Sequence, residues 1–255
     1  MIKVIQTSFW ANQKVAENFA LGCNGQIINI DEYIQKENDV IATHGILRGT
    51  DKILKRSKNF YYIDNGYFGS TKRSFTNKGG AVMHGRDLDG YFRIVHNNLI
   101  HSGLGKNDDK RLKIFNINFK PLRKSGEFII LSEPSQYISA FFNLKDWTYN
   151  TIKSLQKYTD RKIFVHNKKS KVRLDTLLQY AWAFVSFQST AGFKAMINGV
   201  PAHFTHENLT TINSIKNIEE GSIDYQIFNN LSYGQWTLKE MRSGEAWSFI
   251  NKKIN

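Results

Sequence analysis

Residues 183–201 are Ala-Phe-Val-Ser-Phe-Gln-Ser-Thr-Ala-Gly-Phe-Lys-Ala-Met-Ile-Asn-Gly-Val-Pro, and this stretch carries the strongest fold signal in the chain. The pattern predicts a buried strand over Ala183–Phe187, a polar turn, a short helix closed by glycine, and a further extended segment. Gln188, Ser189 and Thr190 lie at the start of that helix. The first N–H groups of a helix lack partners and lie at the positive end of its dipole, so such a turn is suited to bind phosphate. An ordinary turn with a capping hydroxyl gives the same pattern.

The composition indicates a folded protein with enough residues for a sizeable core. Of the 255 residues, 41% are hydrophobic and 13% aromatic. Cys23 is the only cysteine in the sequence, which excludes an internal disulfide and favours the reducing cytoplasm. The sequence has no run of about 18 apolar residues for a membrane helix, and Met1–Gln6 predicts a first strand rather than a signal peptide. We therefore expect a cytoplasmic protein without membrane insertion.

The charge is strongly positive. A formal net charge of +13 favours polyanionic partners such as nucleic acid, acidic glycans or nucleotide phosphates. The chain is also rich in Lys, Asn and Ile together, which an AT-rich genome would produce, so part of the lysine excess can reflect base composition. The basic clusters are Lys52/Lys55/Arg56/Lys58, Lys106/Lys110/Arg111/Lys113, Arg123/Lys124 and Lys168/Lys169/Lys171/Arg173.

Strands alternate with helices in two successive halves, which predicts an α/β fold of two Rossmann-like, doubly wound halves facing a cleft. In the first half we expect strands at Val4–Thr7, Ile27–Ile30, Val40–Thr43, Phe60–Ile63 and Phe92–Val95 and helices at Ala11–Leu21 and Asp51–Lys58. In the second half we expect strands at Phe128–Leu131, Ile163–Val165 and Ala183–Phe187 and helices at Asp146–Tyr158 and Leu174–Tyr180.

A polar, glycine-containing stretch over His101–Ser125 marks the predicted junction between the halves. We expect an acceptor-side domain over residues 1–122, a donor-nucleotide domain over 123–236, and a helical segment over 237–255 that packs back on the first domain. Gly66–Gly90 is predicted to be a long irregular loop, and loops of this length are usually functional or mobile.

Polar residues follow three of the predicted strands. Asp64 follows one strand, Gln188–Thr190 another, and Ser132–Gln136 a third. In doubly wound sheets ligands bind at the carboxyl ends of the strands, so these side chains are expected at the mouth of the cleft.

Three segments together resemble the capsule-polysaccharide-type glycosyltransferases of the GT-B class, including the Kdo-transferase-like members. Asp64-Asn65-Gly66-Tyr67-Phe68 resembles the acidic-x-Gly-aromatic segment of that family. Ser186–Pro201 is similar to its Ser-Ser/Thr-x-x-x-Glu-Ala-x-x-x-Gly-x-Pro signature, and Leu231–Gly244 resembles the tail of compact, phage-encoded proteins of this type. The resemblance implies an enzyme that uses a nucleotide-sugar as substrate, with no cofactor.

One position departs from the family signature. Lys194 stands where the signature usually has Glu, and an ammonium group cannot accept hydrogen bonds from a ribose diol. We therefore expect donor recognition through Glu207 or Glu133, or a different sugar nucleotide. The chain is also short for a two-domain transferase, which implies a minimal acceptor domain.

The resemblance implies that Asp64 lies at the anomeric centre, as nucleophile or general base. A carboxylate can bond to that carbon, stabilise its positive charge, or take the proton of the acceptor. Asp64-Asn65-Gly66 can equally form a simple turn. His44 follows a predicted strand and is the second catalytic candidate, with a structural histidine as the alternative.

The expected binding residues fall into two sets. The donor set centres on the predicted phosphate turn, with basic residues to neutralise the phosphates, and comprises Gln188, Ser189, Thr190, Gly192, Glu133, Gln136, Lys168, Arg173 and Glu207. The acceptor set is basic and comprises Lys72, Arg73, Arg86 and Arg93.

No metal is expected. His203 and His206 beside Glu207 have a spacing that permits a metal site but lack helical context. Asp87-Leu88-Asp89 matches the Asp-x-Asp pattern of transferases of another fold, but it lies in a glycine-rich loop and not at a strand end.

The leading hypothesis is a nucleotide-sugar glycosyltransferase. Its acceptor is expected to be a hydroxymethylated base in phage DNA, flipped out of the stack, or a capsular or surface glycan, which the resemblance itself favours. Two other classes stay open, namely a non-catalytic nucleic-acid-binding protein with the same fold and an epimerase or hydrolase. The sequence leaves open the donor sugar, the stereochemical outcome and the oligomeric state.

Overall fold

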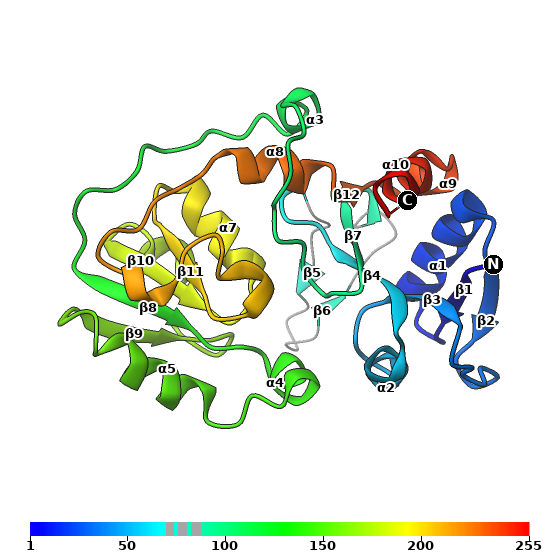
Figure 1. Ribbon diagram of the computed structural model, residues 1–255, viewed down its shortest axis with the longest axis horizontal. Helices are drawn as coiled ribbons and strands as arrows, with labels where there is room; N and C mark the ends of the chain where they lie inside the picture. Colours follow the sequence, from blue (N-terminus) through cyan, green and yellow to red (C-terminus); the bar gives the residue numbers. More distant parts are fainter. Residues whose placement is uncertain (70–73, 76–80, 83–87, 255) are drawn as a thin grey trace. The chain divides into compact units, whose positions relative to one another are not determined.

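The chain divides into two compact units in the computed structural model, which describes residues 1–69, 74–75, 81–82 and 88–254 (Figure 1). The first unit comprises Met1–His101 and Asn230–Asn255, and the second comprises Ser102–Asn229. By its contacts the segment 102–122 thus belongs to the second unit, and the division after His101 falls at the start of the stretch His101–Ser125 in which the junction was predicted. The C-terminal residues belong to the first unit.

The first unit is built on a six-stranded sheet of β1 (Lys3–Gln6), β2 (Gln26–Asn29), β3 (Val40–His44), β4 (Asn59–Asn65), β7 (Phe92–His96) and β12 (Gln235–Trp236). The strand order is β12-β7-β4-β3-β1-β2. β1 to β4 run parallel, β7 pairs antiparallel with β4, and β12 pairs antiparallel with β7. β5 (Ser74–Phe75) and β6 (Ala81–Val82) form a separate antiparallel pair.

The helices of this unit are α1 (Trp10–Cys23), α2 (Thr50–Arg56), α9 (Leu238–Arg242) and α10 (Glu245–Ile254). α1 packs against α9 and α10, and it buries Phe19 in a core that also contains Tyr61 and Trp236. At Gly22 the backbones of α1 and α9 come so close that an added Cβ would lie 1.7 Å from the carbonyl oxygen of Met241. The C-terminal residues therefore complete the core of the first unit.

The second unit contains a four-stranded sheet of β8 (Phe128–Ser132), β9 (Lys162–His166), β10 (Ala181–Ser186) and β11 (Ala202–Phe204). All its strands are parallel and their order is β11-β10-β8-β9. Its helices are α3 (Lys110–Lys113), α4 (Gln136–Phe142), α5 (Trp147–Leu155), α6 (Leu174–Leu177) and α7 (Thr190–Ile197), with 3-10 turns η2 (Glu207–Leu209) and η3 (Ile215–Asn217). The boundary between the units falls within α8 (Gln226–Ser232).

The parallel strands of both units follow the same order. In each unit the first strand lies between the second and the third, and the fourth lies beyond the third. This is a doubly wound order, with a topological switch point between β1 and β3 in the first unit and between β8 and β10 in the second. The predicted α/β class with parallel sheets is thus confirmed.

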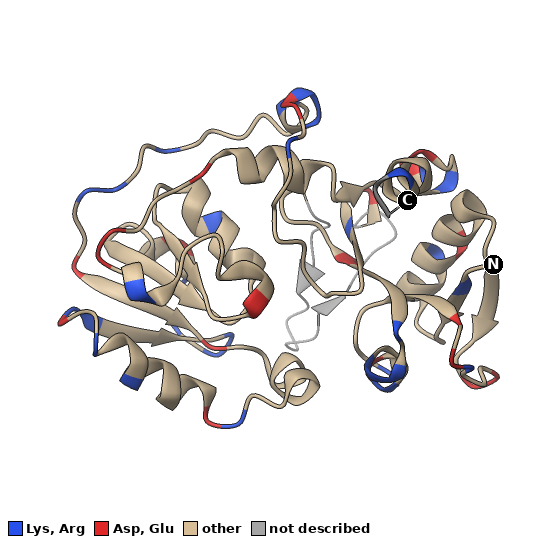
Figure 2. Ribbon diagram, viewed as in Figure 1, with Lys and Arg blue, Asp and Glu red and all other residues tan. Residues whose placement is uncertain are grey.

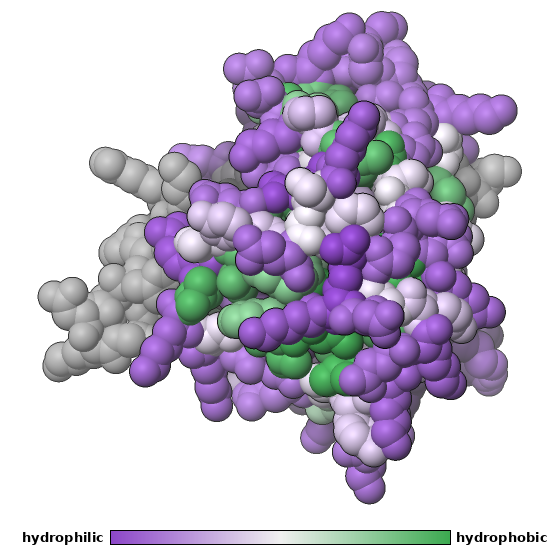
Figure 3. Space-filling view, turned by 90° about the vertical axis from the view of Figure 1, so that its left-hand side faces the viewer, coloured by the Kyte–Doolittle hydropathy of each residue, from purple (hydrophilic) through white to green (hydrophobic). Residues whose placement is uncertain are grey.

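The face of the molecule shown in Figure 3 is mostly hydrophilic, with smaller hydrophobic areas between the polar side chains. None of the described helices is long and apolar enough to cross a lipid bilayer.

Candidate functional site

Asp64 lies near the carboxyl end of β4, where its carboxylate accepts hydrogen bonds from three directions. Oδ2 accepts from the Tyr62 hydroxyl at 2.7 Å and from Arg93 Nη2 at 3.0 Å, and Oδ1 accepts from the Asn65 N–H at 2.8 Å. Tyr62 and Asp64 lie two residues apart and so share a face of the sheet. Arg93 lies directly opposite Asp64 on β7, so the ion pair is a cross-strand pair.

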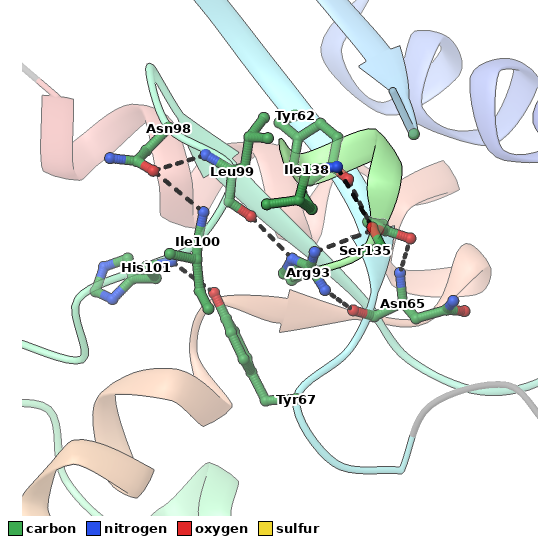
Figure 4. Close-up of polar contacts among 12 residues, drawn as sticks. Tyr62, Asn65, Tyr67, Arg93, Asn98, Leu99, Ile100, His101, Ser135 and Ile138 are labelled. Carbon is green, nitrogen blue, oxygen red and sulfur yellow. Dashed lines mark hydrogen bonds and ion pairs between the residues drawn. The ribbon is translucent and has the colours of Figure 1, made fainter. Parts of the chain in front are cut away.

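Arg93 is bound within the first unit through several of its donors. Besides its ion pair with Asp64, Nη1 donates to the carbonyl oxygen of Asn65 at 2.6 Å and Nε donates to that of Leu99 at 3.1 Å (Figure 4). Its side chain is only 12% exposed, against 28% for Asp64. Arg93 is one of the predicted acceptor-binding residues, and in the structure it lies against the Asp64 carboxylate.

These contacts set the protonation state of Asp64. Burial raises the pKa of this carboxyl, but the Arg93 guanidinium, the His44 imidazole, the Tyr62 hydroxyl and the Asn65 N–H lower it, and the net pKa lies below its ordinary value. Burial also raises the pKa of the Tyr67 hydroxyl, to about 12. Asp64 is therefore an anion at neutral pH, surrounded by neutral hydroxyls and one cation.

Gln235 is a residue of this site that the sequence analysis missed. Its Oε1 accepts from the N–H groups of Tyr67 at 2.6 Å and Phe68 at 3.3 Å, and its Nε2 donates to the Phe68 carbonyl at 2.8 Å. The Gln235 side chain is fully buried, and an added Cβ at Gly66 would lie 2.7 Å from its Oε1. Gln235 thus fixes the backbone that follows Asp64. Because it lies 168 residues from Tyr67, no local sequence signal could reveal it.

His44 ends β3, the strand next to β4, and so lies at a neighbouring strand end, as expected. Its ring packs edge-on against Phe92, with centroids 5.8 Å apart, and its carbonyl oxygen accepts from Asn12 Nδ2 at 3.1 Å. In the ladder between β3 and β4, His44 lies opposite Ile63, the residue before Asp64.

In the second unit Glu133 follows β8 and links two neighbouring segments. Its Oε1 accepts from the Thr148 hydroxyl at 2.8 Å, and its Oε2 accepts from Asn167 Nδ2 at 2.8 Å. Each carboxylate oxygen can accept a second hydrogen bond, so Glu133 keeps capacity for a ligand hydroxyl.

The turn after β10 contains buried oxygen atoms that need partners. Ser189 caps α7, with its Oγ accepting from the Ala191 N–H at 3.2 Å. Ser186 Oγ and Gln188 Oε1 are buried and have no hydrogen-bond partner among the described residues. Burying such groups unsatisfied costs free energy, so the turn favours a bound water or ligand that supplies the missing bonds.

The other predicted donor residues differ in their surroundings. Thr190 is the first residue of α7. An added Cβ at Gly192 would lie 2.6 Å from the Phe204 ring, so the absence of a side chain at Gly192 lets α7 pack on β11. Gln136, Lys168, Arg173 and Glu207 are exposed side chains of the second unit. Arg173 and Lys194 both pair with Asp175, at 3.6 and 2.5 Å. The acceptor candidates Lys72, Arg73 and Arg86 lie outside the described residues.

Within the part of the chain that the structure describes, no group of three or more His, Cys, Asp or Glu side chains is arranged to hold a metal ion. His203 Nδ1 lies 2.8 Å from the Ser214 carbonyl oxygen, and His206 Nδ1 accepts from the Asn208 N–H at 3.3 Å. Both imidazoles are therefore bound to backbone groups of their own unit.

Comparisons with known proteins place the fold. No protein-family model matches the sequence, and no curated protein matches it. Among solved structures, the chain is similar to KpsC of Thermosulfurimonas dismutans, beta Kdo 2,7 transferase, with a TM-score of 0.51 and 10% identity over 99% of both chains. A beta Kdo 2,4 transferase of KpsC from the same organism matches with a TM-score of 0.44 and 10% identity over 91% of this chain and 89% of that one. The first likeness supports a Rossmann-like, GT-B-like fold.

Proposed function

We propose that this protein is a glycosyltransferase that moves a sugar from a nucleotide-sugar donor to an acceptor hydroxyl. The observation that carries the proposal is the Asp64 carboxylate, held as an anion near a strand end by Arg93. The similarity of the fold to a beta Kdo 2,7 transferase supports it.

The protonation state of Asp64 favours a nucleophile over a general base. An efficient base has a pKa near the operating pH, whereas the pKa of Asp64 is lowered. In the proposed reaction a carboxylate oxygen attacks the anomeric carbon as the bond to the nucleotide phosphate breaks, and the phosphate leaves with the electron pair. The acceptor hydroxyl then attacks the anomeric carbon of the glycosyl–Asp64 ester, passes its proton to the nucleotide phosphate released in the first step, and frees the carboxylate. Two displacements give net retention.

We assign the nucleotide to the second unit. The phosphates would lie at the start of α7, on Ser189 and Thr190, where Ser186 Oγ and Gln188 Oε1 need partners. Oε1 and Oε2 of Glu133 would accept hydrogen bonds from the ribose hydroxyls. Exposed side chains around this turn complete the proposed site, namely Gln136, Lys168, Arg173 and Glu207, with Gly192 inside α7.

The acceptor has two candidate classes. The net charge of +13, with Lys and Arg seen in both units (Figure 2), supports a polyanion, and we retain a hydroxymethylated base of phage DNA as one acceptor. The activity of the structurally similar transferase supports a capsular or surface glycan as the alternative. If DNA is the acceptor, its binding weakens steeply as salt rises because many phosphates are contacted, whereas a glycan held through a single anionic group shows a much shallower dependence on salt.

The test has two stages. A donor that binds only the folded protein raises its melting temperature, so thermal melts with CMP-, UDP- and GDP-sugars identify the nucleotide. Mass spectrometry then follows transfer to each acceptor and detects a glycosyl adduct on the protein. We expect Asp64→Asn to lower turnover by at least about 1000-fold because the nucleophile is lost, while donor binding persists because the proposed nucleotide contacts lie in the second unit. Asp51→Asn, at a half-buried position in the first turn of α2, is the matched control.

No melting shift with any donor would contradict the proposal. Full activity of Asp64→Asn would contradict the role of Asp64. A protein that binds DNA identically with and without the Asp64→Asn change, and never transfers sugar, would instead be a non-catalytic nucleic-acid-binding protein with this fold.

A further inference from the structure

The switch point of the first unit lies between β1 and β3, and two loops meet there. The loop after β1 contains Thr7 and Phe9, and the loop after β3 runs from Gly45 to Gly49. Buried Asn12 ties these loops together, because its Oδ1 accepts from the Thr7 N–H at 2.7 Å and its Nδ2 donates to the His44 carbonyl at 3.1 Å. Switch points are the places where open α/β sheets bind ligands.

Arg48, in the second of these loops, has an unusual backbone. Its φ is +59°, in the left-handed region, between Gly45 at +78° and Gly49 at +91°. The other non-glycine residues with positive φ in the described part of the chain are all Asn or Asp, which tolerate this region. A strained arginine that the surrounding fold maintains points to a functional role.

The Arg48 side chain is held in place by an aromatic ring. Its guanidinium carbon lies 4.3 Å from the centroid of the Phe9 ring, and Phe9 itself packs against the core of the unit. Arg48 is exposed, and no carboxylate of the described residues lies within ion-pair distance of it. A stacked guanidinium keeps its N–H edge available, and that edge matches the two oxygens of a carboxylate or phosphate.

Arg48 also lies near the candidate nucleophile. The Gly45 N–H donates to the carbonyl oxygen of Ile63 at 2.9 Å, and Ile63 precedes Asp64 on β4. Arg48 is the third residue after Gly45, a reach of at most about 11 Å. An anion bound by Arg48 would thus lie on the same edge of the sheet as Asp64.

We propose that Arg48, stacked on Phe9, binds an oxyanion of a saccharide substrate, a carboxylate or a phosphate, at the switch point of the first unit. This site extends the proposed function, on which it rests, by assigning the first unit an acidic sugar rather than a neutral one. Arg48 is a binding residue in this proposal, and Asp64 keeps the chemistry.

The test measures binding by ligand-detected NMR with three small probes: methyl glucuronide, glucose 6-phosphate and the neutral methyl glucoside. We expect the protein to bind at least one anionic probe about tenfold more tightly than the glucoside, as charge-assisted hydrogen bonds provide. Arg48→Gly should abolish this preference without lowering the melting temperature, because glycine favours a positive φ. Arg48→Lys keeps the charge without the planar edge and should bind with intermediate affinity.

Arg56→Gln, on α2 of the same unit, is the control for loss of one exposed positive charge and should keep the preference. A preference for the glucuronide alone or for the phosphate alone supports the proposal and identifies the anion. Equal binding of all three probes, no binding of any probe, or an unchanged preference in Arg48→Gly would overturn it. Since these readouts need no turnover, they fail or succeed independently of the donor melts and transfer assays.

Discussion

The parallel strands of the two units have the same order, but the polar side chains near their carboxyl ends differ in how many hydrogen bonds they form. In the first unit Asp64 accepts from Tyr62, Asn65 and Arg93, and the backbone after it is fixed by Gln235. In the second unit Ser186 Oγ, at the end of β10, and Gln188 Oε1, in the turn that follows, are buried without partners among the described residues.

We interpret this difference as a preorganised charge in the first unit and, in the second unit, the nucleotide-binding turn that we propose. Fully satisfied networks in a low dielectric are rigid, and a carboxylate held in one needs no reorganisation when charge develops on a substrate. Unsatisfied buried oxygens cost stability and regain it when a ligand binds. Changes at the first unit should therefore lower the free energy of unfolding, whereas changes at the turn after β10 should alter binding instead.

The largest effect is expected from breaking the buried ion pair. Arg93→Met leaves the Asp64 carboxylate without its cation, and we expect the free energy of unfolding to fall by about 3 kcal/mol in urea titrations. The control is Lys14→Met, since Lys14 and Glu17 also pair at 3.0 Å but with side chains 58% and 40% exposed. That change should cost no more than about 0.5 kcal/mol. If both variants lose the same free energy of unfolding, burial does not explain the contribution of the Arg93–Asp64 pair.

The second effect concerns Gln235, whose side chain binds the backbone of Tyr67 and Phe68. Gln235→Leu removes three hydrogen bonds, namely those that the Gln235 side chain makes with the Tyr67 N–H, the Phe68 N–H and the Phe68 carbonyl oxygen. We expect a loss of about 2 kcal/mol in the same titration. Gln235→Glu keeps an accepting oxygen but loses the donor and buries a carboxylate opposite the Phe68 carbonyl, so at neutral pH it should lose at least as much stability as Gln235→Leu. If Gln235→Leu has the same free energy of unfolding as the wild type, these hydrogen bonds do not stabilise the fold.

Sequence reasoning captured the parts of this fold that repeat locally. Strand and helix periodicity located β1 to β4, β7 to β10 and α1 within a few residues. Asp64 was predicted to lie near the carboxyl end of a parallel strand, and it does. It missed α4, a short helix rich in aromatic and β-branched residues that begins after the cap Ser135, whose Oγ accepts from the Ile138 N–H. Helix α6 ends at Leu177 rather than at Tyr180.

The partners of Asp64 were beyond local reasoning because tertiary pairing creates them. Arg93 lies on an antiparallel strand, 29 residues from Asp64 in the sequence. The sequence alone does not show which carboxylate such a basic residue will pair with. Arg48 carried no motif at all, because its left-handed backbone and its stacking on Phe9 exist only in the folded chain.

As the pH falls, protonation of histidines in the second unit should lower the free energy of unfolding before protonation of Asp64 does. Burial lowers the pKa of His203 and of His206, so below about pH 6.5 the unfolded chain binds more protons at these positions than the folded one. The free energy of unfolding should therefore fall as pH drops from 7 toward 5. The stabilisation from Asp64, whose pKa is lowered, is present above its ordinary value of 3.8 and is lost only at lower pH.

His203→Asn tests this order through urea titrations at several pH values. The variant should show a shallower decline of unfolding free energy between pH 7 and 5 than the wild type, and the difference should be smaller than the loss from Gln235→Leu. An identical decline in both proteins would assign the acid sensitivity to other groups.

The smallest change in stability is expected at Ser186. Its hydroxyl is buried without a partner among the described residues, so Ser186→Ala removes an unsatisfied group and breaks no hydrogen bond there. Unfolding free energy should stay within about 0.5 kcal/mol of the wild type, with any shift toward greater stability. Donor melts supply the other half of the test, because a ligand that bonds to this hydroxyl must bind more weakly to the variant. A stable Ser186→Ala protein with an undiminished donor shift would mean that the turn after β10 does not hold the nucleotide, and the contrast between the two units would then rest on the first alone.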